Sequence, residues 1–238
     1  MKLFEYKLDE TVAILTMNSG ENTFNPTFLN AFLDVLNRVE NETDACTLVV
    51  TSSHEKIFSN GLDLQWLVPV VRNNDIDTAK DFFYLLNRVF KRILLFPMVT
   101  VAAISGHVFA GGAILSCCFD FRFMRSDRGY FCLPEVDLKI PLLPGMLALL
   151  KRAIPGYKFD EIQFTGSRLI ATECQEHHII TKACHISTLM DETLDFAKKL
   201  GKDRTIVGEM KKRMHTDILH ALDVKDVEYI ESGYFHIE

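Results

Sequence analysis

Apolar and polar positions alternate in two short segments near the start of the chain, residues 4–8 and 12–17, on either side of Asp9-Glu10-Thr11. Alternation with a period of two is typical of strands that bury one face, so these residues predict a hairpin. A helical spacing follows from Asn25-Pro26 to about Glu40. One face of that helix collects the apolar residues Phe28, Phe32, Val35 and Leu36.

Two largely apolar runs lie further along the chain, at residues 47–51 and 98–104. Runs of this length and composition are typical of strands buried on both faces of a parallel sheet. Residues 119–124 are expected to form a third strand. A helical pattern over residues 78–95 separates the two runs, and a short helix of small residues over 113–118 precedes the third strand. Strands that alternate with helices in this order predict an α/β fold with crossover helices.

From Pro144 onward the spacing is mostly helical, with one expected strand near residues 179–185 and three expected helices within 189–237. No stretch rich in proline, glycine or serine separates these helices from the preceding residues. We therefore expect a core unit over residues 1–188 and a helical region over 189–238. Without a linker, that region should pack on the core or on a neighbouring subunit.

The charge balance narrows the class of partner. Lysines and arginines number 26 against 32 acidic residues, which gives a net charge of −6, and the longest basic tract is Lys211-Lys212-Arg213. Nucleic-acid binding usually rests on a large basic footprint, so we expect no nucleic-acid partner. We interpret the basic tract as a solvated helix face, with contact to a ligand phosphate as the alternative.

Several further features point to an ordinary cytoplasmic protein. The chain has six cysteines, none in a Cys-x-x-Cys pair, and we expect them to be reduced core residues. No run of 18 or more apolar residues occurs and no signal-peptide pattern opens the sequence, so we expect no membrane association. His177-His178 and Cys117-Cys118 have no spacing suited to a metal, so no metal site is expected.

Two glycine-containing junctions follow buried strands, one at Ser59–Asp63 and the other at Ser105–Gly112. Glycine permits positive φ and lets a ligand approach backbone N–H groups. The second junction also opens a helix, whose free N–H groups and positive dipole end favour a negative oxygen. If the two junctions face each other, they form an oxyanion hole from main-chain donors. The alternative is that both are ordinary turns.

A carboxylate lies downstream in an apolar context. Glu135 has Leu133, Val136 and Leu138 as close neighbours in sequence. Desolvation by such neighbours raises the pKa of a carboxyl group, which suits a base that must also return its proton near neutral pH. The alternative is a glutamate at a helix start that interacts with the helix dipole. Asp137 is a second candidate acid, unless it faces away.

These three segments, Phe58–Leu64, Gly106–Gly112 and Pro134–Leu138, occur in the order and at the separations found in the enoyl-CoA hydratase/isomerase (crotonase) superfamily, which the chain resembles over about residues 1–185. The resemblance implies a spiral of ββα units with a C-terminal helical trimerisation region. It also implies an oxyanion hole made by the N–H groups of Leu62 and Gly111.

One position discriminates between reactions within this superfamily. Its hydratases use two glutamates, one of which aligns with Glu135, while the other belongs three residues beyond Gly111, where this chain has Ile114. Isoleucine cannot hold or activate water. The pattern is most similar to the plant-type Δ3,Δ2-enoyl-CoA isomerases, also over Phe123–Gly129. The resemblance therefore implies an isomerase of the fatty acid β-oxidation type, which converts 3-enoyl-CoA to trans-2-enoyl-CoA with one glutamate as acid/base.

The resemblance also implies an acyl-CoA thioester as partner, a homotrimer or hexamer, and no cofactor beyond the coenzyme A that the substrate carries. The CoA adenine would lie near Lys56–Phe58, and Asp63 is expected to cap the following helix. The expected substrate-binding residues are Lys56, Phe58, Asn60, Gly61, Asp63, Gly112 and Ile114. The alternatives are another crotonase reaction, namely hydration, thioester hydrolysis or decarboxylation, or a non-catalytic acyl-CoA-binding member.

Overall fold

The computed structural model describes residues 2–235 and begins with the expected hairpin of β1 (Phe4–Asp9) and β2 (Val12–Met17). Helix α1 (Pro26–Glu42) follows, and it begins where the sequence predicts. The side chain of Asn25 caps it by accepting a hydrogen bond from the Phe28 N–H at 3.0 Å. Proline at the first helical position costs no hydrogen bond, because that N–H has no partner in any helix.

The largest sheet has six strands in the order β1-β2-β4-β7-β9-β12, and all neighbours are parallel except β1 and β2. The four strands added to the hairpin are β4 (Thr47–Ser52), β7 (Val99–Ile104), β9 (Phe121–Arg125) and β12 (Lys182–Cys184). The predicted parallel sheet with crossover connections is therefore confirmed.

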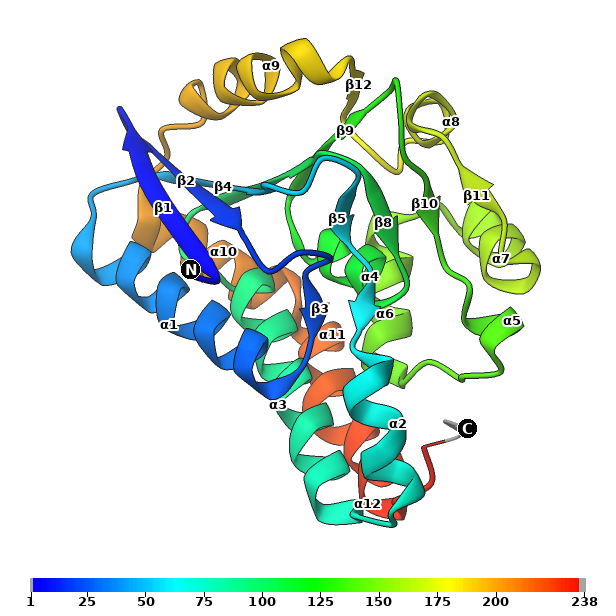
Figure 1. Ribbon diagram of the computed structural model, residues 1–238. Coiled ribbons are helices and arrows are strands. Elements are labelled where there is room, and N and C mark those ends of the chain that lie inside the picture. Colours follow the sequence, from blue (N-terminus) through cyan, green and yellow to red (C-terminus); the bar gives the residue numbers. More distant parts are fainter. Residues whose placement is uncertain (1, 236–238) are drawn as a thin grey trace.

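Helices cover both faces of this sheet (Figure 1). On one face, α9 (Ile186–Lys198) packs through Leu189 and Ala197 against alternate strand residues such as Val49 and Val101. The opposite face belongs to the main core, to which α1 and α3 (Ile76–Leu94) contribute. Burial on both faces explains why these strands are continuously apolar. The boundary expected between residues 188 and 189 falls inside α9.

A second sheet, of four short strands in the order β11-β10-β8-β5, was not predicted strand by strand. Its members are β5 (Ile57–Ser59), β8 (His107–Phe109), β10 (Phe131–Cys132) and β11 (Arg168–Leu169), and a separate pair joins β3 (Thr23–Phe24) to β6 (Gly61–Leu62). Strands β5, β8 and β10 follow β4, β7 and β9, respectively. Helices α2 (Leu64–Arg72) with α3, α4 (Gly111–Cys118) and α5 (Glu135–Leu138) complete three strand–strand–helix units. This repetition is the spiral of ββα units that the resemblance implied.

The remaining helices surround this spiral. They are α6 (Pro144–Ala153), α7 (Gly156–Thr165), α8 (Ala171–Glu176), α10 (Arg204–Met214), α11 (Thr216–His220), a π-helical turn (Ala221–Lys225) and α12 (Asp226–Ser232). Helix α12 packs on α3, and α11 packs on α6, so the C-terminal region contacts the core of its own chain. The expected third tail helix ends before residue 237, which lies outside the described residues.

The interpretation of Lys211-Lys212-Arg213 as a solvated face is wrong for Lys211. Its side chain is buried, and Nζ lies 2.8 Å from the Met98 carbonyl oxygen and 2.6 Å from Asp120 Oδ2. Lys212 and Arg213 are exposed, as expected. The difference arises because α10 packs against the loops at the start of β7 and β9. One of its three neighbouring cations therefore faces inward.

Five of the six cysteines are buried, and all six are free thiols, as the sequence predicts. Within residues 2–235, no helix combines the length and the apolar character needed to cross a bilayer. Across the same residues, no three histidine, cysteine, aspartate or glutamate side chains gather in a way that suits a metal ion.

Candidate active site

The two glycine junctions lie against each other. Gly61 has φ +77°, and a Cβ added to it would lie 2.4 Å from the backbone nitrogen of Gly111. A Cβ added to Gly112 would lie 2.4 Å from the Ser59 carbonyl oxygen. Any side chain at these two positions would force the loops apart, so glycine is required for the approach. The expectation that the junctions face each other is confirmed.

The second junction leaves backbone donors free at the start of α4. The first N–H groups of a helix have no intrahelical partner, and Gly111 is the first residue of α4. Its N-cap residue, Ala110, provides no side-chain hydrogen bond. Ala110 adopts φ +51° and ψ −126°, an unusual conformation for a residue with a Cβ, and its N–H donates to the Cys132 carbonyl at 3.0 Å. The junction is therefore held in place while the Gly111 N–H stays available.

The first junction presents a second donor. The N–H of Asp63 donates to the Phe24 carbonyl at 3.0 Å, which fixes this strand edge against β3. Because successive N–H groups along an extended strand point to opposite sides, the Leu62 N–H is directed away from β3. Leu62 and Gly111 both line one cavity. Two main-chain donors from two separate loops therefore border the same space.

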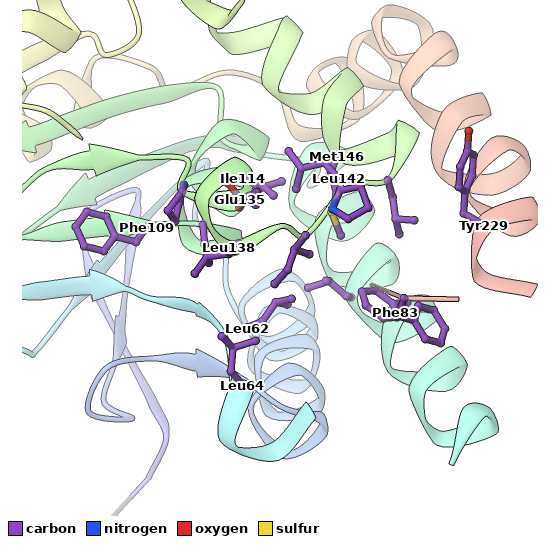
Figure 2. A pocket seen from close by; sticks show the side chains of 18 of the residues that line it. Leu62, Leu64, Phe83, Phe109, Ile114, Glu135, Leu138, Leu142, Met146 and Tyr229 are labelled. Carbon is purple, nitrogen blue, oxygen red and sulfur yellow. The ribbon is translucent and has the colours of Figure 1, made fainter. Parts of the chain in front are cut away.

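This cavity has a volume of about 490 Å³, within the range typical of small-molecule sites. Figure 2 shows Leu62 and Leu64 below it, Ile114 and Glu135 near its centre, and Met146 above. Most of its lining side chains are apolar. An apolar cavity with a few convergent polar groups is the usual form of a ligand or active site.

Glu135 is the one acidic side chain among the described residues that line this cavity. It is only 5% exposed, and its Oε2 has no hydrogen-bond partner. Burial raises the pKa of Glu135 to about 7, as the sequence predicted in direction. The source of burial agrees with the expectation in part. Leu133 is fully buried and Leu138 lines the same cavity, but Val136 and Leu138 are 43% and 47% exposed. Other walls of the cavity, including Ile114 and Met146, also enclose the carboxyl group.

The remaining predicted residues divide into two groups. Asn60 and Ile114 line the cavity together with Leu62, Gly111 and Glu135. The cavity lining does not include Lys56, Phe58, Gly61, Asp63 or Gly112.

Several residues of the second group support the loops. Asp63 caps α2, as expected, by accepting hydrogen bonds from the Trp66 N–H at 3.2 Å and from Asn25 Nδ2 at 2.9 Å. Phe58 is fully buried, whereas Lys56 is exposed and its carbonyl accepts the His107 N–H at 2.7 Å.

Two other candidates do not reach the cavity. Asp137 is exposed and is not a lining residue, so it faces away from Glu135. His107 has an unpartnered Nδ1, and its ring contacts Phe109 and Tyr130. Burial lowers the pKa of His107, and the positive charge of Arg168 lowers it further. Both findings agree with a supporting role for this histidine in the second sheet.

Sequence reasoning missed most of the far wall of the cavity. Met146 of α6, Tyr229 of α12 and Phe235 beyond it line the space. They do so beside Phe83 of α3, which the sequence already indicates as a wall of the core or of an acyl pocket. Their apolar spacing was visible, but it predicts a buried helix face without telling whether that face meets other helices or a cavity. Only the packing of α12 on α3 brings residues so distant in sequence to the same wall.

Comparison with known proteins agrees with this geometry. A profile of the family described as enoyl-CoA hydratase/isomerase matches residues 7–236. Enoyl-CoA delta isomerase 3 of Arabidopsis thaliana is 25% identical over 218 residues, which cover 89% of this chain and 91% of the relative. A short-chain-enoyl-CoA hydratase of Clostridium acetobutylicum is 26% identical over 204 residues, 85% of this chain and 76% of the relative.

Solved structures give the same fold. The apo structure of an enoyl-CoA isomerase from Mycobacterium tuberculosis superimposes with a TM-score of 0.87 over 98% of this chain and 99% of the other, at 20% sequence identity. Similarity at this level of identity shows the fold alone. The family profile spans nearly the whole chain and includes both glycine junctions and Glu135. The chain belongs to the enoyl-CoA hydratase/isomerase family of the crotonase superfamily.

Proposed function

We propose that this protein isomerises 3-enoyl-CoA to trans-2-enoyl-CoA, with Glu135 as the single acid/base. The observation that carries the proposal is the cavity's combination of one buried carboxyl group with two backbone donors. Among the described lining residues no second carboxylate is present, because Ile114 occupies the position where hydratases of the family have one. Such a site is equipped to move a proton within one ligand.

The proposed reaction has two proton transfers. The thioester oxygen accepts hydrogen bonds from the N–H groups of Leu62 and Gly111. The Glu135 carboxylate removes a proton from C2, and the electron pair of that C–H bond gives a dienolate whose negative charge rests largely on the thioester oxygen. The resulting carboxylic acid then delivers the proton to C4, so the carboxylate is regenerated and the double bond lies between C2 and C3.

The energetics of the site favour these two proton transfers. One oriented backbone donor at a developing oxyanion contributes about 3 to 4 kcal/mol of transition-state stabilisation in enzymes where it has been measured. A pKa of about 7 for Glu135 leaves both the base and its conjugate acid accessible near neutral pH. The raised pKa also strengthens the carboxylate as a base toward a weakly acidic C–H group.

Coenzyme A serves as the handle of the substrate in this proposal. The reaction is redox-neutral, and the proton that leaves C2 balances the one that reaches C4, so the chemistry requires no cofactor or metal. Hydration is the main competing reaction, because a relative of similar identity is named a hydratase. It requires a group that activates water, and Ile114 is unable to do so.

Incubation with 3-hexenoyl-CoA tests the proposal. We expect the conjugated 2-enoyl product, detected by its absorbance and by mass spectrometry, without a hydrated product. Formation of 3-hydroxyacyl-CoA from 2-hexenoyl-CoA would assign hydration instead, and release of free coenzyme A would assign thioester hydrolysis. Tight binding with no chemical change in any of these substrates would identify a non-catalytic member of the family.

We further infer a homotrimer or a pair of trimers. Helix α10 exposes Ile206, Met210 and Met214, which recur every four residues and so form one apolar stripe. A stripe of this kind in contact with water favours burial against another subunit. Sedimentation at micromolar concentration should give a mass at least three times 27.2 kDa. A single 27.2 kDa species would contradict the inference.

A further inference from the structure

The cavity extends well beyond the carboxyl group and the two backbone donors. In Figure 2 it runs from Phe109, Leu62 and Glu135 on one side to Phe83 and Tyr229 on the other. Glu135 lies on the side that would hold the thioester. The opposite side is walled by α3, by α12 and by Tyr234 and Phe235, which lie beyond α12. The acyl chain of a bound thioester would point toward this far wall.

The far wall is fixed by contacts between α12 and α3. Glu231 of α12 accepts hydrogen bonds from the Tyr84 hydroxyl at 2.7 Å and from Lys80 Nζ at 2.9 Å. Gly233 then ends α12 with φ +68°, and a Cβ at this position would lie 2.8 Å from Ile76 Cγ2. Glycine therefore allows the chain to turn closely beside α3.

This turn places one aromatic ring at the end of the cavity. Phe235 is 9% exposed, and its ring stacks on that of Phe83 with centroids 4.7 Å apart and an interplanar angle of 19°. Both rings line the cavity. A stacked aromatic pair is a rigid apolar surface. It would meet the methyl end of an acyl chain and limit how far that chain can extend.

We propose that Phe235, stacked on Phe83, forms the end wall of the acyl subsite and selects straight-chain thioesters of about eight to twelve carbons. This inference rests on the proposed function for the identity of the ligand. A methylene group is about the size of a water molecule, whose share of liquid volume is about 30 Å³. Eight to twelve carbons therefore fill roughly half to three quarters of the 490 Å³ cavity. The remaining space accommodates the thioester. A four-carbon chain fills only about a quarter of the same volume.

Equilibrium binding of saturated acyl-CoAs from four to sixteen carbons tests this wall without requiring turnover. Each added methylene that reaches apolar surface should tighten binding by roughly threefold to fourfold. We expect this increase to stop between eight and twelve carbons, where the chain meets the ring pair. Affinity that rises uninterrupted to sixteen carbons would overturn the inference.

Two substitutions move the wall in opposite directions. We call the chain length at which the increase in affinity stops the break. Phe235→Ala should move the break to chains at least two carbons longer, which raises the affinity for a fourteen-carbon chain relative to an eight-carbon chain by about tenfold. Phe235→Trp should move the break to shorter chains. The matched control is Phe164→Ala, because Phe164 is 74% exposed on α7 and does not line the cavity. The control should leave the break where it is.

The outcomes separate packing from selection. If Phe235→Ala weakens binding of all chain lengths by one common factor, or leaves the break unmoved, Phe235 only packs and the inference is wrong. Thermal melting establishes that each variant is folded. If Phe235→Ala is unfolded, Phe235→Leu takes its place and should shift the chain length at the break in the same direction by a smaller amount. If the break moves as expected but the protein isomerises no 3-enoyl-CoA, the role of Phe235 as the end wall is supported and the proposed function is wrong.

Discussion

The two ends of helix α4 differ in how their backbone groups are satisfied. At the C-terminal end, the Arg122 guanidinium donates to the carbonyls of Ser116 and Phe119 at 3.2 and 2.8 Å, and Arg152 donates to the Phe119 carbonyl at 3.1 Å. At the N-terminal end, no side chain caps the helix, and Gly111 borders the cavity. Cations at one end complement the helix dipole, while the other end is left for a ligand.

The neighbouring charges differ in the same way. Beside the C-terminal end, Asp120 lies 2.6 Å from Lys211 Nζ and 3.5 Å from an Arg152 nitrogen, so these buried and half-buried charges compensate one another. Beside the N-terminal end, Glu135 is buried with an unpartnered oxygen. An unpaired buried carboxylate opposes folding unless it is protonated. The contacts at the C-terminal end of α4 therefore stabilise the fold, whereas the unpaired carboxylate at the N-terminal end destabilises it and is available for catalysis.

The largest expected effect comes from removing the acid/base at the N-terminal end. Glu135→Gln keeps the size and hydrogen-bonding capacity of the side chain but cannot transfer a proton, so isomerisation should fall by about 10²- to 10⁴-fold. Affinity for the acyl-CoA should change little, because backbone groups and other contacts hold it. Steady-state kinetics and equilibrium binding measure the two quantities. Asp137→Asn is the matched control, since Asp137 is exposed and does not line the cavity. Near-normal turnover in folded Glu135→Gln would falsify the mechanism.

The next largest effect should come from the C-terminal end. Arg122→Met removes the guanidinium donor from the carbonyls of Ser116, Phe119 and Ile179. The Ser116 carbonyl keeps the Phe119 N–H and the Phe119 carbonyl keeps Arg152, so the Ile179 carbonyl loses most. A hydrogen bond from a charged donor contributes about 1.5 to 3 kcal/mol, so the free energy of unfolding should fall by roughly 2 to 4 kcal/mol. Denaturant titration measures it.

Arg38→Met is the control for this substitution, because Arg38 forms an exposed i,i+4 pair with Glu42 and lies over the Tyr6 ring at the surface. Its removal should cost less than about 1 kcal/mol. If the two variants lose equal stability, the guanidinium cap at the C-terminal end of α4 contributes no more to the free energy of unfolding than an exposed arginine does.

The pH dependence of stability should reverse the usual expectation for a carboxylate. Since burial raises the pKa of Glu135 from 4.5 to about 7, the native state holds a proton that the unfolded state has lost between these values. The contribution of Glu135 to the stability of the wild type should therefore decrease as the pH rises from 4.5 to 7. Glu135→Gln avoids that loss and should be more stable than the wild type by up to about 3 kcal/mol at pH 8. Unfolding titrations of both proteins at pH 5 and pH 8 test this, and an equal difference at the two pH values would contradict it.

The smallest expected effect lies in the middle of α4. Ile114→Glu introduces a second carboxylate that lines the same cavity as Glu135, and it should add weak hydration of 2-enoyl-CoA. The effect should be small, because water also needs room beside the acyl chain. Formation of 3-hydroxyacyl-CoA measures it. A folded variant with no hydration above wild type would show that a carboxylate at this position is insufficient.

Much of the fold was predictable because its signals are local. Strands β4 and β7 are largely apolar runs, and the second glycine junction follows β7 directly, while the first follows soon after β4. The strands of the second sheet are only two or three residues long, too short for any periodicity. Three of them, β5, β8 and β10, follow longer strands closely in the chain, and the sequence marks this only by nearby glycines.

The candidate site was predictable in part for the same reason. Glu135 and the two junctions are recognisable in sequence, but of the three neighbours to which its raised pKa was assigned only Leu133 is fully buried, while Val136 and Leu138 are half exposed. Lys211 was assigned to the surface because its neighbours are basic. Both errors arise where burial depends on which helix packs nearby, and Phe235 at the far wall was missed for the same reason.

The cavity joins residues that are widely separated along the chain, from Leu62 through Gly111 and Glu135 to Phe235. Contacts between distant residues form late in folding, because the entropy of loop closure must be overcome before they contribute. The β1–β2 hairpin and the helices can form earlier from neighbouring residues. During refolding, secondary structure should therefore recover before ligand binding does. The interval between the two would define a partly folded state whose apolar cavity walls are still open to water, which makes that state the most prone to aggregate.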